Sequence, residues 1–373
     1  MTMAKRIIIS GGGTGGHIFP AIAIANALKR LAPDTVLLFV GANGKMEMEK
    51  VPAAGYEIVG LDIQGINRSS LWKNLALPFK LYKSIRKARR IIHDFQPNVA
   101  VGVGGYASGP LLHAAARMNI PSLIQEQNSY AGITNKRLAA KADKVCVAFE
   151  NMERYFPKDK ILFTGNPIRH DAVAIQHKRA EAMAFFGLST EKKTILLTGG
   201  SLGARTLNET MREGLGRLVA ADVQVIWQCG SYYYDSLREA MGTRYDGIVK
   251  LTAFLQRMDF AYAAADIIIA RAGAGTIAEL CVVAKPTILV PSPNVAEDHQ
   301  TKNAQALVNK AAALTVADSE APRKLMDTAL ELLNNQQQSE TLRSNLKELA
   351  IRDADEVIAR EILRLAEDSR QQM

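Results

Sequence analysis

Cysteine is scarce in this chain of 373 residues, and the three present form no recognisable pattern. Cys146, Cys229 and Cys281 are odd in number and far apart, without a Cys-x-x-Cys pair. Neither a disulfide framework nor a zinc site is therefore indicated, and a reducing cytoplasm fits this usage.

Long apolar runs are missing as well. The chain passes from Met1 through Lys5 and Arg6 into only three isoleucines, far short of the apolar region of a signal peptide. No stretch reaches the roughly 18 apolar residues that a membrane-spanning helix needs. We therefore expect neither secretion nor a membrane span.

Metal-ligand patterns are absent from the loops where a metal-dependent sugar-nucleotide site would need them. The Asp-x-Asp at Asp353 to Asp355 lies instead in a C-terminal region that we expect to be helical. We expect no metal ion and no cofactor.

Acidic residues are missing between Asp62 and Asp94, although the whole chain has a formal net charge of only +9. Eight basic residues, Arg68, Lys73, Lys80, Lys83, Arg86, Lys87, Arg89 and Arg90, alternate there with Leu71, Trp72, Leu75, Leu77, Phe79, Leu81 and Tyr82. Such a segment can dock on anionic lipid, or it can be an ordinary surface helix with its apolar side on the core. No nucleic-acid-binding module is recognisable.

The size and the apolar content of the chain are sufficient for two domains. Of its residues, 48% are apolar and 22% charged, and a single core rarely grows to this length. The pattern of Ile7 to Gly16, an apolar run before a glycine-rich loop, returns at Ile195 to Ala204. The chain therefore contains a duplicated unit.

Short β-branched runs alternate with helical patterns around both copies, which is typical of parallel sheets covered by helices. Strands are expected at about 5–10, 35–40, 57–60, 98–103, 121–125, 143–147 and 161–164, then at 193–199, 223–228, 247–250, 266–270 and 287–290. We predict two Rossmann-like domains, 1–164 and 165–349, with a cleft between them. The last helix, within 350–373, should pack back on the first domain.

The first glycine loop, residues 11–17 (GGGTGGH), follows the strand Ile7 to Ile9 and precedes a helix-like stretch from Ala21 to Leu31. Such a junction directs backbone N–H groups at an anion. Gly11, Gly13 and Gly16 also match the dinucleotide fingerprint G-x-G-x-x-G. A dehydrogenase, however, needs an acid near the end of the second strand, where this chain has Gly41, Ala42 and Asn43.

Three more glycine loops follow expected strands: the second at 102–109 with Tyr106 and Ser108, the third at 199–201 with Ser201, and the fourth at 271–279, which contains Ala274, Gly275, Thr276 and Glu279. Ligands of open α/β sheets bind beyond the carboxyl ends of the strands. One such loop is a weak signal, but four at strand ends indicate a ligand site.

Polar clusters also fall on expected loops, at Glu126 to Asn128, at Asn166 to Arg169, and at 297–300 with Asn303. Each of them can equally be loop polarity or helix capping. Arg169 is the exception, because a guanidinium group matches the geometry of a diphosphate.

Taken in order, the motifs GGGTGGH, GVGGYASGP, EQN with AGITNK, GNPIR, GGSLGAR with Asn208, GAGTIAE and DHQTKNA resemble one family along almost the whole chain. It is the family of bacterial peptidoglycan glycosyltransferases that add N-acetylglucosamine to undecaprenyl-diphosphate-linked N-acetylmuramoyl-pentapeptide (lipid I), forming lipid II. The resemblance implies the two-domain GT-B architecture. It also implies a peripheral location at the cytoplasmic face of the bacterial plasma membrane, with other cell-wall synthesis proteins as further partners.

The resemblance further implies which residues bind the donor, UDP-N-acetylglucosamine. The nucleotide and its diphosphate would be bound by Ser201 and Arg169, the ribose by Glu279, the uracil by the Leu255 backbone, and the sugar by Gln300. The donor site would be completed by Thr14, Gly15, Gly16 and Asn128. Further substrate-binding candidates are Ala274, Gly275, Thr276 and Tyr106. The membrane-facing patch would comprise Trp72, Leu75, Phe79, Lys80, Tyr82 and Lys83. Two departures are Gln125, where the family often has histidine, and His299, which replaces a glutamine.

The family's donor is α-linked and its product β-linked, so one displacement inverts the anomeric carbon. His17 is our candidate for the base, because a helix N-terminus disfavours the charged imidazole; the alternative is that Glu126 is the base. Rival readings are another UDP-sugar-dependent GT-B enzyme acting on a lipid acceptor, a UDP-sugar epimerase, and a non-catalytic membrane-surface protein.

Overall fold

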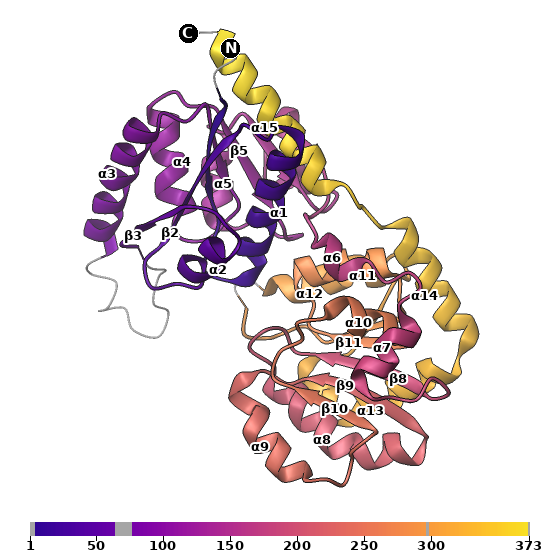
Figure 1. Cartoon of the computed structure of the whole chain (residues 1–373). Helices are drawn as coiled ribbons and strands as arrows, with labels where there is room; N and C mark the ends of the chain where they lie inside the picture. Colours follow the sequence, from indigo (N-terminus) through magenta and orange to yellow (C-terminus); the bar gives the residue numbers. More distant parts are fainter. Residues whose placement is uncertain (1–3, 64–76, 296–297, 372–373) are drawn as a thin grey trace. The chain divides into compact units, whose positions relative to one another are not determined.

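Two parallel sheets form the framework of the chain (Figure 1). The computed structural model describes residues 4–63, 77–295 and 298–371. The chain divides into a first unit, Met1–Ile168 with Arg352–Met373, and a second unit, Arg169–Ile351. The division thus falls after Ile168 rather than at Gly165.

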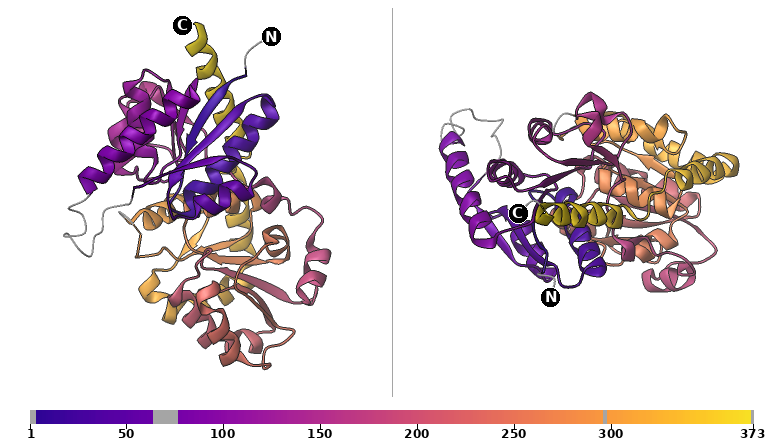
Figure 2. Two further views of the ribbon diagram at one scale, coloured as in Figure 1. Left: turned by 60° about the vertical axis from the view of Figure 1, so that its left-hand side comes forward. Right: turned by 90° about the horizontal axis from the view of Figure 1, so that it is seen from above.

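The sheet of the first unit has the strand order β3-β2-β1-β4-β5-β6-β7. Its strands are β1 (Arg6–Ser10), β2 (Val36–Ala42), β3 (Ile58–Leu61), β4 (Val99–Gly102), β5 (Ser122–Glu126), β6 (Lys144–Val147) and β7 (Ile161–Phe163). Its helices are α1 (Gly15–Leu31), α2 (Glu47–Ala53), α3 (Leu77–Phe95), α4 (Ser108–Arg117), α5 (Ile133–Ala139) and α15 (Ala354–Gln371), with short 3-10 turns at Met152–Arg154 and Lys158–Lys160. Helices cover both faces of this sheet (Figure 2).

The apolar run of β1 serves both faces of the sheet. Ile7 and Ile9 pack under α1 and α15, whereas Ile8 packs on the opposite side with residues of α3 and α4. Successive side chains of a strand point to opposite faces, so a continuous apolar run is what a strand covered on both sides requires.

The sheet of the second unit has the order β10-β9-β8-β11-β12-β13. Its strands are β8 (Lys193–Thr198), β9 (Val223–Gln228), β10 (Val249–Thr252), β11 (Ile267–Ala270), β12 (Thr287–Leu289) and β13 (Leu314–Thr315). Its helices are α6 (His170–Val173), α7 (Arg179–Phe186), α8 (Arg205–Ala220), α9 (Ser231–Met241), α10 (Met258–Ala264), α11 (Ala274–Val283), α12 (His299–Val308), α13 (Ala321–Asn334) and α14 (Gln336–Glu348), with a 3-10 turn at Asp318–Glu320.

The strand orders explain why the four glycine loops matter. In each sheet the order in which successive strands are added reverses at a switch point, between the parallel strands β1 and β4 in the first unit and between β8 and β11 in the second. The first and second glycine loops follow β1 and β4, and the third and fourth follow β8 and β11. Each pair therefore flanks the place where doubly wound sheets bind ligands. This is the GT-B architecture, two parallel-sheet α/β domains.

The C-terminal helix α15 returns to the first unit and packs along α1 (Figure 1). Ile358, Ile362 and Leu365 join the core under α1. Arg30 of α1 also donates to the buried carboxylate of Asp355 over 2.8 Å. The end of the chain therefore completes the apolar cover of one face of the first sheet.

Two elements differ from the expectations. α1 begins at Gly15, two residues before His17, where the helix was expected to begin; Thr14 is extended, and its carbonyl accepts hydrogen bonds from the N–H groups of His17 (3.1 Å) and Ile18 (3.2 Å). β13 was not expected, since a two-residue strand carries no periodic signal.

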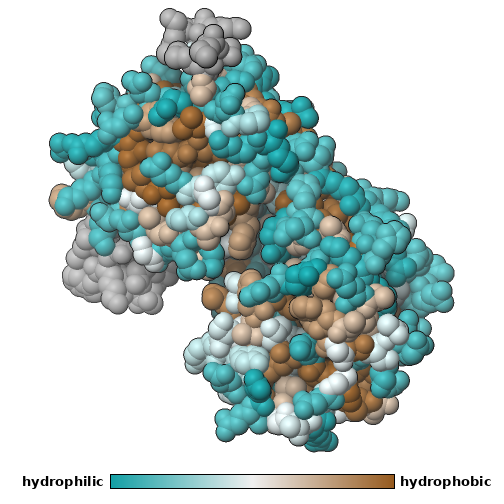
Figure 3. Space-filling model, in the orientation of Figure 1, coloured by the Kyte–Doolittle hydropathy of each residue, from teal (hydrophilic) through white to brown (hydrophobic). Residues whose placement is uncertain are grey.

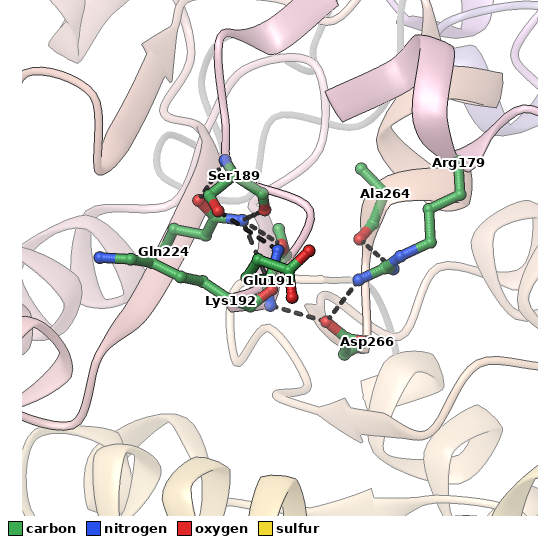
Figure 4. Close-up of polar contacts among 8 residues, drawn as sticks. Arg179, Ser189, Glu191, Lys192, Gln224, Ala264 and Asp266 are labelled. Carbon is green, nitrogen blue, oxygen red and sulfur yellow. Dashed lines mark hydrogen bonds and ion pairs between the residues drawn. The ribbon is translucent and has the colours of Figure 1, made fainter. Parts of the chain in front are cut away.

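A polar network ties together the amino ends of β8, β9 and β11, at the edge of the second sheet away from its glycine loops (Figure 4). Asp266 accepts from the Thr194 N–H (2.8 Å) and from Arg179 (3.1 Å). The fully buried Gln224 donates to the Ser189 carbonyl (2.6 Å) and accepts from the Ser189 N–H (3.0 Å). These hydrogen bonds hold the first residues of β8, β9 and β11 and the loop at Ser189 in place, so the role of this network is structural.

No helix among the described residues is both long and apolar enough to cross a membrane. Over the same part of the chain, no group of three or more histidine, cysteine, aspartate or glutamate side chains could hold a metal ion.

Candidate functional site

The first glycine loop leads directly into α1 and places His17 in the first turn of that helix. Thr14 is the extended N-cap, and Gly15, Gly16 and His17 follow it. The opening N–H groups of a helix have no partner within the helix, so they favour an anion. Thr14 and Gly16 are exposed, and Gly15 and His17 are half-buried.

The second glycine loop packs against the first. A Cβ on Gly105 would lie 2.3 Å from the Gly12 carbonyl oxygen, and one on Gly104 would lie 2.6 Å from the His17 ring. Both residues also have positive φ, so glycine is required there. Ser108 is buried and donates to the Ser10 carbonyl over 2.9 Å, whereas Tyr106 is exposed beside the loops.

Glu47 is a residue of this site that the sequence reasoning missed. It begins α2, is only 1% exposed, and accepts from the Gly13 N–H (2.8 Å) and the Ala42 N–H (3.0 Å). A carboxylate therefore does reach the region after the second strand, but it binds the glycine loop rather than standing at the strand end. The sequence signal that could have identified Glu47 is an acidic residue at the start of the helix that follows the second strand.

Glu126 is surrounded by donors from its own loop. Its Oε1 accepts from the Asn128 N–H over 3.1 Å, and its Oε2 accepts from the Gly132 N–H over 3.0 Å and from the Asn135 amide over 2.9 Å. The residue is 2% exposed. Both oxygens thus hold the 126–135 loop together, and Asn128 is positioned by this carboxylate.

The third glycine loop is joined to Leu255 through Gln228 at the end of β9. The Gln228 amide donates to the Gly200 carbonyl over 2.8 Å, and its oxygen accepts from the Leu255 N–H over 3.1 Å. Ser201 is exposed at the tip of this loop. The Leu255 N–H therefore already has a partner. A uracil ring that binds at this position would contact the Leu255 carbonyl instead.

The fourth glycine loop opens α11, whose first three residues are Ala274, Gly275 and Thr276 behind an extended Gly273. These residues supply the N–H groups of a helix N-terminus, which favours an anion.

Arg169 and Glu279, 110 residues apart, form a bidentate ion pair in the second unit. Arg169 Nε lies 2.9 Å from Glu279 Oε1, and its Nη2 lies 3.2 Å from Oε2. The phenol of Tyr262 in α10 donates to Oε2 over 3.0 Å. Burial by itself lowers the pKa of Arg169, but the Glu279 carboxylate raises it above its ordinary value. The Glu279 carboxylate is therefore held by two partners, Arg169 and Tyr262.

Gln300 lies in the first turn of α12. Its side-chain oxygen accepts from the Ser292 N–H over 2.8 Å. Asn303, one turn later, is fully buried and donates to the Ala272 carbonyl over 3.3 Å. The loop after β12 and the fourth glycine loop are thus held to the same helix.

The basic segment forms α3 from Leu77 onward, and Trp72 and Leu75 lie outside the described residues. Its later turns pack on the sheet through Ala88 and Ile92. Its first turns expose Phe79 (60%) and Tyr82 (63%), with the Lys83 ammonium 4.5 Å from the centre of the Phe79 ring; Lys80 is half-buried there. Figure 3 shows an apolar area on this face of the first unit, in the region of α3 and α4.

Known proteins are similar to this chain along almost its whole length. The family model for the glycosyltransferase family 28 N-terminal domain matches residues 7–147, and the model for its C-terminal domain matches residues 194–358. The UDP-N-acetylglucosamine--N-acetylmuramyl-(pentapeptide) pyrophosphoryl-undecaprenol N-acetylglucosamine transferase of Parabacteroides distasonis is 56% identical over 360 residues, 96% of this chain and 98% of that protein. This chain belongs to that transferase family.

Solved structures agree with this assignment. The crystal structure of Acinetobacter baumannii MurG matches with a TM-score of 0.78 and 29% identity, covering 96% of this chain and 99% of that chain. A UDP-N-acetylglucosamine 2-epimerase matches with a TM-score of 0.64 but only 15% identity, over 97% of this chain and 96% of that one. The epimerase therefore shares the fold alone.

Proposed function

We propose that this family 28 glycosyltransferase moves N-acetylglucosamine from UDP-N-acetylglucosamine to undecaprenyl-diphosphate-linked N-acetylmuramoyl-pentapeptide, the step of peptidoglycan synthesis that forms lipid II. The observation that carries the proposal is the 56% identity to the Parabacteroides transferase over nearly the full length of both chains. The paired glycine loops at both switch points supply the anion-binding sites that a nucleotide sugar and a diphosphate lipid require.

The donor's nucleotide binds to the second unit in this proposal. Glu279 accepts three hydrogen bonds, two from Arg169 and one from Tyr262. A carboxylate has about four lone-pair sites, so it can take one ribose hydroxyl while the ion pair persists. Arg169 is our candidate for the diphosphate, because a guanidinium group matches the geometry of a diphosphate. Ser201 would contribute a hydroxyl to the same phosphates, and Leu255 its carbonyl to the uracil.

The helix N-terminus at Ala274, Gly275 and Thr276 stabilises the charge that develops on the departing UDP. Fixed dipoles aimed at developing charge need no reorganisation during the reaction. Gln300 would contact the sugar, and it is already oriented by the Ser292 N–H. Together with Arg169, these groups replace a metal ion, so turnover should be unaffected by EDTA.

In the first unit, Thr14, Gly15, Gly16, Tyr106 and Asn128 surround the substrates in our proposal. Thr14, Gly16 and Tyr106 are exposed at the glycine loops. Asn128 follows the carboxyl end of β5 and is held in place by Glu126.

His17 is the proposed base. The acceptor's hydroxyl oxygen bonds to the anomeric carbon, the bond from that carbon to UDP breaks with its electron pair leaving on UDP, and the hydroxyl proton passes to His17. Glu126 is a weaker candidate, because the donors of its own loop occupy both of its oxygens. General base catalysis contributes about 100- to 10,000-fold, so His17→Ala should lower kcat by that order. Glu126→Gln should act mainly through a less stable loop.

The exposed start of α3 is the proposed membrane contact. Phe79 and Tyr82 are aromatic and exposed; Lys80 lies between them in the chain, and Lys83 follows Tyr82. Aromatic rings insert at the headgroup level, and each basic group near an anionic surface adds about 1 kcal/mol. Such docking would hold the enzyme at the cytoplasmic face of the plasma membrane, beside its lipid acceptor and other cell-wall synthesis proteins.

The test is transfer of radiolabelled N-acetylglucosamine from its UDP donor to lipid-linked muramoyl-pentapeptide in detergent, with simple alcohols and sterols as control acceptors. Label in the disaccharide lipid alone supports the proposal. Label only in the controls would discard the peptidoglycan acceptor, and conversion of the donor to an epimer without transfer would favour an epimerase. Near-normal turnover of His17→Ala would refute the assigned base.

A further inference from the structure

One peptide group lies between Glu47 and His17. The carbonyl oxygen of Gly12 is 3.0 Å from His17 Nδ1. The N–H of the same peptide unit, which belongs to Gly13, donates to Glu47 Oε2 over 2.8 Å. A carboxylate, a peptide and an imidazole therefore form one continuous chain of hydrogen bonds.

The position of Glu47 is built into the backbone around it. A Cβ on Gly12 would lie 2.2 Å from Glu47 Oε1, and a Cβ on Gly41 would lie 2.6 Å from its Cγ. Two glycines, Gly12 in the first glycine loop and Gly41 in β2, thus make room for this side chain. The carboxylate is 1% exposed, and burying a charge is costly unless hydrogen bonds compensate it.

The contact with Gly12 fixes the tautomer of His17. A carbonyl oxygen only accepts hydrogen bonds, so Nδ1 must carry the proton. In the neutral ring the lone pair is then on Nε2, the nitrogen on the other side of the ring. An imidazole held in this tautomer is a proton acceptor through Nε2.

We propose that Glu47 is a positioning residue for His17 and acts through the Gly12–Gly13 peptide. The carboxylate polarises the peptide, which strengthens the carbonyl as an acceptor. The carbonyl then holds the ring in one tautomer and stabilises the imidazolium that forms when His17 takes a proton. The carboxylate of a serine protease triad does the same by direct contact. This inference rests on the proposed function in which His17 is the base.

The first test is Glu47→Gln, with Glu49→Gln as the matched control. Glu49 lies on the same helix, but it is exposed and pairs with Lys50. Glutamine can still accept from the Gly13 N–H, but the charge is gone. The outer partners of metal-bound histidines typically contribute about 10- to 100-fold to activity, and this gives the scale for a carboxylate that supports an imidazole through one peptide. We therefore expect kcat to fall at least tenfold, the KM for UDP-N-acetylglucosamine to change less than twofold, and the control to match the wild type.

The pH profile separates positioning from a purely structural role. A carboxylate that stabilises the imidazolium about fivefold through the peptide raises the pKa of the ring by roughly 0.7 unit. Without the negative charge the imidazolium is less stable, so the rise of kcat/KM with pH should move to lower pH by that amount. Tyr106 is a second titratable side chain against this loop, and it is the same in the wild type and in Glu47→Gln.

Nitrogen-15 NMR of the imidazoles tests the inference without relying on turnover. In the wild type, His17 should show a protonated Nδ1 at neutral pH. In Glu47→Gln its titration midpoint should fall, and the two tautomers should mix. Glu47→Asp, which keeps the charge, should lie between the two proteins and serves if the glutamine variant does not fold.

An unchanged tautomer and midpoint in the variants would overturn the role of Glu47. If instead the spectra change as expected but His17→Ala retains turnover, the coupling stands and the assignment of the base fails. The two proposals therefore fail separately.

Discussion

The hydrogen bond from Tyr262 to Glu279 is the contact whose removal gives the clearest energetic test of the donor site. Tyr262 is 1% exposed, and its hydroxyl lies 3.0 Å from Glu279 Oε2. Burial and the neighbouring carboxylate raise the pKa of this phenol well above its ordinary value. The hydroxyl therefore keeps its proton and remains a donor at neutral pH.

Tyr262→Phe removes this donor and leaves the ring in place. A hydrogen bond to a charged group contributes about 1.5–3 kcal/mol. Because Arg169 still binds both oxygens of Glu279, we expect a loss near the lower end, about 1.5–2 kcal/mol. In a unit of this size that corresponds to a fall in Tm of roughly 3–8 °C.

Calorimetry of the wild type, Tyr262→Phe and Tyr232→Phe measures the effect. Tyr232 is 86% exposed, so its variant controls for loss of a phenol hydroxyl as such. We expect only the transition of the second unit to move, and UDP to stabilise the Tyr262 variant less than the wild type. A Tm for Tyr262→Phe within 1 °C of the control would refute the reasoning, because a buried contact with a charge would then contribute nothing.

Three further outcomes are expected. A hydrogen bond from Arg257 holds the pKa of the Asp259 carboxyl well below its usual range, so Asp259→Asn should unfold at lower urea concentration than the wild type at pH 7, and the difference should narrow as the pH falls below about 4. Gly105→Ala should abolish most transfer activity, because the added methyl group displaces the first glycine loop. Gly187 also has a positive φ, but no atom lies within 4 Å of its Cβ position, so Gly187→Ala should keep the transfer activity and lower the stability of the fold by only about 1 kcal/mol. Equal activities of the two variants would contradict this. Burial lowers the pKa of Lys285 to about 8, so its charged form destabilises the fold below that pH, and Lys285→Met should raise Tm more at pH 7 than at pH 10.

The strands and glycine loops were predictable because their signals are local. The isoleucines of β1 and the glycines after them lie within a few residues of one another, and the same arrangement recurs at β8. Parallel topology then follows from the alternation of strands and helices. The two-residue β13 and the early start of α1 escaped prediction, because the first has no periodicity and the second depends on the conformation of Thr14.

The roles of the polar clusters could not be read from the sequence. Glu126 and Asn128 looked alike as loop residues, but the structure makes Glu126 an internal acceptor that positions Asn128. Likewise, Asn303 is buried under the fourth glycine loop, whereas Gln300 lies in the first turn of the same helix. The folded structure decides which side-chain oxygens and amides form hydrogen bonds within the protein, because these bonds depend on three-dimensional contact.

The two α/β units, the places of their glycine loops and the family that the motifs resemble could all be predicted from the amino-acid sequence, since each depends on short-range pattern. The ion pair of Arg169 with Glu279 across 110 residues and the contact of Glu47 with the peptide beside His17 appear only in the folded chain. Pairing of side chains from different loops depends on the directions in which the folded backbone holds them, and no local pattern encodes those directions.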